Sequence, residues 1–173
     1  MKQLYERRSC RNFKSTPVDP EDIEKIVKAG RSAPNSLGAE QISFYVVTKQ
    51  DYLKTIIKET KIALQKIPEL KDYPEESFIY GSPCVIIMTA PQDDMKWSEY
   101  DCGCCAANMC TAAEILGLGS IVLGILQPAE DAIKKLLSID QNEHVLMSVA
   151  IGYSNDAKKS FEKNLTSKVV YYK

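Results

Sequence analysis

Histidine is nearly absent from this chain of 173 residues, which contains only His144. The sequence has no Gly-x-Ser-x-Gly motif, so a serine hydrolase with a Ser–His–acid triad is excluded. It also has no spaced set of His, Cys and acidic ligands, and we therefore predict no metal site. We expect His144 to be a packing or surface residue at the start of a strand. This absence of catalytic groups favours an organic cofactor as the source of the chemistry.

The sequence also lacks an excess of either charge and any long apolar run. Its 22 Lys and Arg residues nearly balance its 23 Asp and Glu residues, which argues against nucleic acid as a partner. The longest uncharged runs, 102–113 and 115–129, contain glycines and are too short to cross a membrane, so we expect no membrane partner. Because the first residues are charged and no signal peptide is visible, we expect a cytoplasmic protein.

The composition is that of a folded globular protein, with 45% hydrophobic and 26% charged residues. A chain of this length buries about 70% of its surface on folding, which is enough for one core. There is no internal repeat and no linker. We therefore predict a single domain over residues 1–173.

Hydrophobic periodicity predicts alternating helices and strands. We expect a mixed central sheet flanked by helices on both faces, which is an α+β fold. Asp19 and Pro20 form a typical helix start, and Ser98 and Asp101 have the spacing of a capping box. The predicted helices are 3–10, 19–31, 50–66, 98–117 and 128–137, and the predicted strands are 43–48, 84–89, 120–126 and 145–153.

Four of the six cysteines fall in the predicted helix 98–117. At about 100° per residue they point around the whole helix, so they cannot converge on one tetrahedral ion. We interpret them as small buried hydrophobic side chains. A redox-active thiol pair or a zinc switch is the alternative. These cysteines are Cys102, Cys104, Cys105 and Cys110.

The same helix is small and uncharged on every side, which predicts that other structure encloses it. A domain of this size rarely encloses a helix completely, so we expect a second copy of the chain to pack on it. The alternative is a central core helix in a monomer. The end of the chain is apolar at 169–172, and we expect this tail to dock on the partner, where it could add a strand to the partner's sheet.

Three segments carry groups suited to ligand binding. Residues 7–11, Arg-Arg-Ser-Cys-Arg, place three guanidinium groups and a hydroxyl close together, as a phosphate clamp requires, although a solvated basic turn is the alternative. The loop 33–38 offers short polar side chains and exposed backbone, unless it is only a connection. The glycines at 117, 119 and 124 allow close approach of a flat ligand, but they do not match a dinucleotide-binding fingerprint.

Taken in order, these segments resemble the nitroreductase family of FMN oxidoreductases. The similarity spans nearly the whole chain. It rests on Arg7-Arg8-Ser9-x-Arg11-x-Phe13, Ser32-Ala33-Pro34-Asn35-Ser36, Phe44-Tyr45-Val46-Val47, the helix from Asp101 to Glu114, Gly117-Leu118-Gly119-Ser120, Leu136-Leu137-Ser138-Ile139, Ile151-Gly152-Tyr153, and Lys158 with Lys159.

The resemblance implies an interlocked homodimer with two bound FMN molecules at the subunit interface. NADH or NADPH is the implied hydride donor, and a nitroaromatic, a quinone or another small electrophile is the implied acceptor. Arg11 and Gly124 are the implied catalytic residues. The implied cofactor-binding residues are Arg7, Arg8, Ser9, Arg11, Pro34, Asn35, Ser36, Gly38, Glu40, Leu123, Gly124, Lys158 and Lys159, with Pro34, Asn35 and Ser36 reaching the cofactor from the second chain.

The chain departs from the family pattern at two places. Gly38 and Glu40 stand where family members often have polar contacts to the flavin, and Ser160 replaces a common arginine. These differences motivate an alternative function, a module that binds or stores flavin with little turnover.

Overall fold

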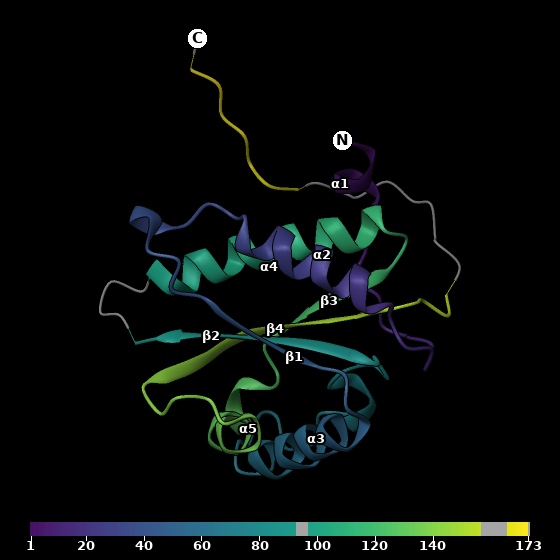
Figure 1. The fold of residues 1–173 in the computed structure, drawn as a ribbon, viewed down its shortest axis with the longest axis vertical. Coiled ribbons are helices and arrows are strands. Elements are labelled where there is room, and N and C mark those ends of the chain that lie inside the picture. Colours follow the sequence, from purple (N-terminus) through teal and green to yellow (C-terminus); the bar gives the residue numbers. More distant parts are fainter. Residues whose placement is uncertain (93–96, 157–165, 173) are drawn as a thin grey trace.

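The protein is described by a computed structural model over residues 1–92, 97–156 and 166–172. A four-stranded sheet crosses the middle of the molecule, with strand order β1-β2-β4-β3 (Figure 1). The strands are β1 (Ser43–Val47), β2 (Cys84–Pro91), β3 (Gly119–Leu123) and β4 (Glu143–Gly152). The helices are α1 (Lys2–Glu6), α2 (Pro20–Arg31), α3 (Gln50–Leu64), α4 (Trp97–Ile115) and α5 (Glu130–Leu137), and the short 3-10 turns are η1 (Ser36–Gly38), η2 (Glu75–Ser77) and η3 (Gln127–Ala129).

The helices form a layer on each face of the sheet, as expected for the α+β fold. Helices α2 and α4 cover one face, while α3 and α5 cover the other (Figure 1). Side chains alternate between the two faces along β2, so Val85 and Ile87 join one core and Ile86 and Met88 the other. Seven of the eight β2 residues are buried, which explains why this strand is continuously apolar in sequence.

The predicted mixed sheet is wrong, because all pairs between the four strands are antiparallel. The prediction of a mixed sheet followed from the alternation of strands and helices along the chain. β2 and β3 do run in the same direction, but β4 lies between them and pairs antiparallel with both. Parallel pairing occurs only as a single bridge between Ser9 and Ser120 within the described residues.

Local interactions set the helix ends. Asp19 caps α2 as predicted, because its carboxylate accepts a 2.9 Å hydrogen bond from the Glu21 N–H. The predicted helix 3–10 ends early, at Glu6, because Arg7 has an extended conformation with φ −53° and ψ 134°. The predicted capping box is also wrong, since Ser98 lies inside α4 rather than before its first residue, and the Asp101 carboxylate binds the distant Ser36.

Helices α2 and α4 pack closely where Gly30 meets Met109. Both residues are buried. A Cβ atom added to Gly30 would lie 2.8 Å from Met109 Cγ and 3.2 Å from Phe44 Cε1. The absence of a side chain at residue 30 therefore sets how closely α2 approaches α4 and β1.

Substituting Gly30→Ala is expected to lower the free energy of unfolding by about 1–3 kcal/mol through overpacking. In a Met109→Ala background the same substitution should cost less, because the clash with Met109 is relieved, only the 3.2 Å contact with Phe44 remains, and Ala favours a helix over Gly. Urea denaturation of the four proteins in this double-mutant cycle measures the coupling. Equal effects of Gly30→Ala in the two backgrounds would contradict the close contact.

Candidate functional site

The arginine-rich segment runs in an extended conformation beside β3. The Cys10 N–H donates a 3.0 Å hydrogen bond to the Ser120 carbonyl, and Ser9 forms the parallel bridge with Ser120. Alternation along an extended chain places Arg7, Ser9 and Arg11 on one side and directs Cys10 into the core. The helical spacing assumed for these residues was wrong. The extended segment nevertheless keeps two arginines and the serine together.

Arg8 turns back toward the first helix. Its Nη1 atom donates hydrogen bonds of 2.9 Å to the Tyr5 carbonyl and 3.0 Å to the Arg7 carbonyl. Arg8 therefore holds the segment in shape and adds positive charge beside it.

The segment leads into a cavity of about 340 Å³ at the end of β3. Three of the residues expected to contact flavin lie in its wall, namely Arg11, Leu123 and Gly124. Nothing lies within 4 Å of a Cβ atom placed on Gly124, so its backbone is open to a ligand. The full lining is Arg11, Tyr73, Ser77, Tyr80, Ile121, Val122, Leu123, Gly124 and Ile125.

Arg11 brings an uncompensated positive charge to this cavity. It is exposed, and within residues 1–92, 97–156 and 166–172 no carboxylate forms an ion pair with it. A guanidinium group beside an open glycine backbone and apolar Ile121 and Leu123 suits a flat ligand with electron-rich oxygens.

The cavity also contains residues that our sequence analysis missed. Tyr73, Ser77 and Tyr80 come from the irregular stretch between α3 and β2, which has no motif of its own. The only signal available in the sequence was the density of hydroxyl-bearing side chains in an otherwise unassigned segment.

The polar loop 33–40 is held by the first turns of α4. The carboxylate of the buried Asp101 accepts hydrogen bonds from the Ser36 N–H at 3.0 Å and from its hydroxyl at 3.0 Å. Asn35 Oδ1 accepts a 3.2 Å bond from the Glu40 N–H. Three residues of the loop have a left-handed backbone conformation, namely Leu37, Gly38 and Glu40. Pro34, Leu37, Gly38 and Glu40 are exposed.

Within a single chain this loop does not lie beside the arginine segment. The loop is anchored at Asp101. Arg7 lies near Cys110 instead. Burial raises the pKa of the Cys110 thiol, and the Arg7 charge lowers that pKa by a smaller amount. These two positions on α4 are nine residues apart, which is about 13 Å along the helix. The residues expected at one site therefore form two groups in the protomer.

The cysteines of α4 are free thiols; Cys102, Cys105 and Cys110 are buried as predicted, whereas Cys104, also predicted to be buried, is only half-buried. Burial raises the pKa of Cys102 to about 12 and that of Cys105 to about 11. Such thiols remain protonated at neutral pH and are poor nucleophiles. No group of three or more His, Cys, Asp or Glu residues in the described part of the chain is arranged to hold a metal ion.

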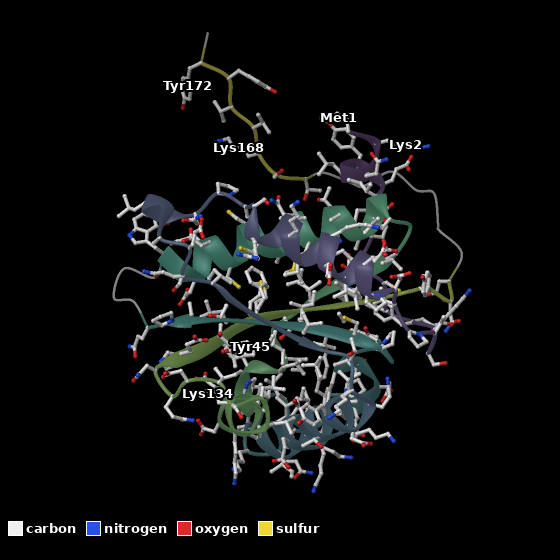
Figure 2. All side chains as sticks on the ribbon, viewed as in Figure 1. Met1, Lys2, Tyr45, Lys134, Lys168 and Tyr172 are labelled. Atoms are coloured by element: carbon white, nitrogen blue, oxygen red, sulfur yellow. The ribbon has the colours of Figure 1, made fainter. Side chains whose placement is uncertain are left out.

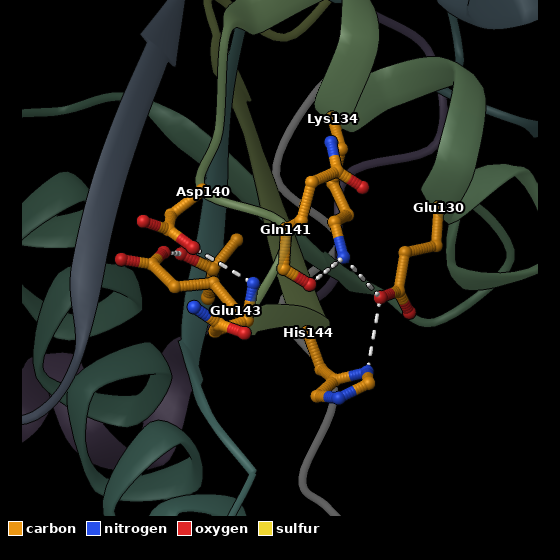
Figure 3. A network of polar contacts seen from close by, with 8 residues as sticks. Glu130, Lys134, Asp140, Gln141, Glu143 and His144 are labelled. Atoms are coloured by element: carbon orange, nitrogen blue, oxygen red, sulfur yellow. Dashed lines mark hydrogen bonds and ion pairs between the residues drawn. The ribbon is translucent and has the colours of Figure 1, made fainter.

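His144 is a surface residue at the start of β4, as expected. Its Nδ1 atom lies 3.0 Å from Glu130 Oε1, and the same carboxylate lies 3.4 Å from the buried Lys134 ammonium (Figure 3). Lys134 also donates a 2.8 Å hydrogen bond to the Gln141 carbonyl. This network fastens α5 to β4, far from the arginine segment in sequence.

Two of the expected phosphate ligands, Lys158 and Lys159, lie outside the described residues, as does Ser160. None of the helices in residues 1–92, 97–156 and 166–172 combines the length and apolar character needed to cross a lipid bilayer.

Comparison with known proteins matches residues 4–153 to the model of the nitroreductase family. The chain belongs to the nitroreductase family. A relative from Archaeoglobus fulgidus with the provisional name NADH dehydrogenase/NAD(P)H nitroreductase is 31% identical, with 94% of this chain and 89% of the relative covered. An FMN reductase [NAD(P)H] from Bacillus subtilis is 24% identical, with 92% and 68% covered. The chain is a nitroreductase-like oxidoreductase.

Solved nitroreductase structures have the same fold. A nitroreductase with bound FMN from Bacteroides fragilis superimposes with a TM-score of 0.86 at 24% identity, covering 98% of this chain and 97% of the other. One from Desulfitobacterium hafniense, also with bound FMN, gives 0.87 at 22% identity, covering 99% and 97%.

The Ser36–Asp101 clamp provides a test of how this nitroreductase loop is held. Ser36→Ala removes a hydrogen bond to a buried carboxylate and should lower the free energy of unfolding by about 1.5–3 kcal/mol. Ser32→Ala is the matched control, because its hydroxyl donates to the Lys28 carbonyl at an exposed position and its loss should cost less than about 1 kcal/mol. Urea denaturation measures the free energy of unfolding of both variants. Equal losses would show that the Ser36–Asp101 bond adds no stability beyond that of an exposed hydrogen bond.

Proposed function

We propose that the protein binds FMN and transfers a hydride from NADH or NADPH to a small electrophile such as a nitroaromatic or a quinone. The observation that supports this most is the cavity that brings Arg11, Leu123 and Gly124 together. Arg11 is far in sequence from the neighbouring residues Leu123 and Gly124, and together the three offer a cation, an apolar wall and an open backbone. A flavin ring needs all three features.

The proposed phosphate site is the extended arginine segment. Arg7 and Ser9 share a side of this segment with Arg11, so they could bind the cofactor phosphate while Arg11 reaches its ring. Arg8 contributes charge beside them. We assign Lys158 or Lys159 to the same phosphate.

The second half of the site comes, in this proposal, from another copy of the chain. The loop residues Pro34, Asn35, Ser36, Gly38 and Glu40, of which Asn35 and Ser36 are half-buried and the others exposed, would reach the ring bound by the partner. The separation of about 13 Å along α4 between the loop anchor and the Arg7 region supports this division. A homodimer then completes two equivalent sites, with residues 1–173 forming one domain in each copy.

The outer surface of α4 supports the homodimer. An uncharged stripe runs along this helix at helical spacing and is exposed or half-exposed in the protomer. The apolar tail, with Tyr172 96% exposed, extends away from the body of the protomer (Figures 1 and 2). Both surfaces would be covered in a dimer. The stripe is Tyr100, Cys104, Ala107, Thr111 and Ile115.

The chemistry supplied by bound FMN would be hydride acceptance from the reduced nicotinamide and hydride donation to the second substrate, which enters after the first product leaves. Reduction places negative charge on the flavin ring. The Arg11 guanidinium and the Gly124 backbone are the proposed catalytic groups, because both would stabilise that charge in a cavity with apolar walls.

Two alternatives make different predictions. A flavin-storage module would bind FMN but show almost no NADH or NADPH oxidation with menadione or a nitroaromatic. A thiol or zinc switch would give a colourless protein with bound zinc. The raised pKa values of Cys102 and Cys105 weigh against the thiol alternative.

Arg11→Ala should slow flavin reduction by NADH about 100-fold while weakening FMN binding only about tenfold, because the charge contributes most when the ring is reduced. Stopped-flow absorbance measures reduction, and fluorescence quenching measures the FMN dissociation constant. Arg31→Ala, at the exposed end of α2, is the control and should change neither value. A change in FMN affinity alone would contradict the catalytic role of Arg11.

Ala107→Glu should convert the dimer to a monomer, because it places a charge in the middle of the uncharged α4 stripe. Sedimentation velocity measures the change. The control is Ile62→Glu, which adds the same charge at an exposed position on α3, on the opposite face of the sheet. A protein that is monomeric before substitution, or a dimer unaffected by Ala107→Glu, would contradict this interface.

A further inference from the structure

One wall of the cavity is formed by hydroxyl-bearing side chains that neither the family motifs nor our sequence analysis assigned. Tyr73, Ser77 and Tyr80 line the cavity together with Arg11 and the end of β3. They come from a single short stretch around η2, which lies between α3 and β2. An unassigned cluster of this kind, next to a guanidinium group that forms no ion pair among the described residues, points to a specific ligand contact.

The backbone holds Tyr80 in an uncommon conformation. Tyr80 has φ +54° and the following Gly81 has φ +73°, so two successive residues are left-handed. For a tyrosine this conformation costs about 1–2 kcal/mol. The Tyr80 carbonyl accepts a 3.2 Å hydrogen bond from the Phe13 N–H, two residues after Arg11. The tyrosine and the arginine are thus fastened to each other through the backbone.

Tyr73 is held by its ring. Its ring stacks on the buried Phe78 with centroids 6.2 Å apart and planes 17° apart. A hydrogen bond with Tyr80 raises the pKa of Tyr73, as does burial, while the Arg11 charge lowers it. Arg11, Tyr73 and Tyr80 are therefore within electrostatic reach of one another at the cavity wall.

Counting protons shows what this cluster offers to a ligand. Tyr73, Ser77 and Tyr80 each have one O–H, and Arg11 adds the N–H groups of its guanidinium. The cavity lining contains no carboxylate among the residues that the structure describes. The wall is rich in donors and therefore suits a ligand edge that carries carbonyl-type oxygens.

We propose that Tyr73 and Tyr80, together with Arg11, hold the oxygen-bearing pyrimidine edge of FMN and favour its reduced, more negatively charged form. This inference rests on the proposed function. A donor next to a cation stabilises negative charge more strongly than it stabilises a neutral carbonyl. The tyrosine pair should therefore act on the reduced cofactor more than on the oxidised one.

The variants Tyr73→Phe, Tyr80→Phe and the double substitution keep the rings and remove only the hydroxyls. Tyr80→Phe should weaken binding of reduced FMN about tenfold more than binding of oxidised FMN. For a two-electron couple this lowers the midpoint potential by about 30 mV. The double variant should change little beyond the larger single effect, because the two hydroxyls act as one unit. Tyr52→Phe on α3, outside the cavity, is the control and should leave the potential unchanged.

The measurements are the FMN dissociation constant from fluorescence quenching and the midpoint potential from a spectroelectrochemical titration. Unchanged potentials in all three variants would overturn the inference. An altered KM for menadione or a nitroaromatic, with unchanged FMN binding and potential, would also overturn the inference, because the hydroxyls would then contact the acceptor. If the unmodified protein binds no FMN, the proposed function itself fails, which is a separate and earlier result.

Discussion

The backbone pairing of Ser9 and Cys10 with Ser120 determines where the functional groups of this protein lie. It aligns the arginine segment with β3, so that Arg11 reaches the end of that strand, where Gly124 leaves the sheet. Cys10 anchors the pairing from the core side, since a Cβ atom on Gly119 would lie only 2.8 Å from the Cys10 Cβ. The Arg11 charge, the open Gly124 backbone and the apolar Leu123 meet at one cavity because of this pairing.

The sheet supplies the rigid support for that arrangement. β4 lies between β2 and β3 and is antiparallel to both, and seven of the eight β2 residues and six of the ten β4 residues are buried. A site built at the end of β3 is therefore attached to the best-packed part of the molecule. The stretch around η2 closes the other side of the cavity through Tyr80, whose carbonyl is bonded to Phe13.

Much of the fold could be predicted from local patterns. The caps and periodicity of α2 and the apolar run of β2 identified these elements within a few residues, because hydrophobic spacing and Asp or Pro at a helix start act locally. The arginine segment was placed in a helix because its spacing fits one, and its pairing with Ser120 through Ser9 and Cys10 shows that it is extended. Asp101 was expected to cap its own helix, but it binds Ser36, 65 residues away in sequence.

The family and the residue types of the site could be identified from the sequence by itself, since the ordered motifs from Arg7 to Tyr153 depend on residue identity and spacing alone. The tertiary structure decided the strand order, the antiparallel pairing and the presence of Tyr73, Ser77 and Tyr80 at the cavity. These features arise from contacts between segments that are distant along the chain. Local propensity does not determine such contacts, because their geometry depends on how the helix layers pack on the sheet.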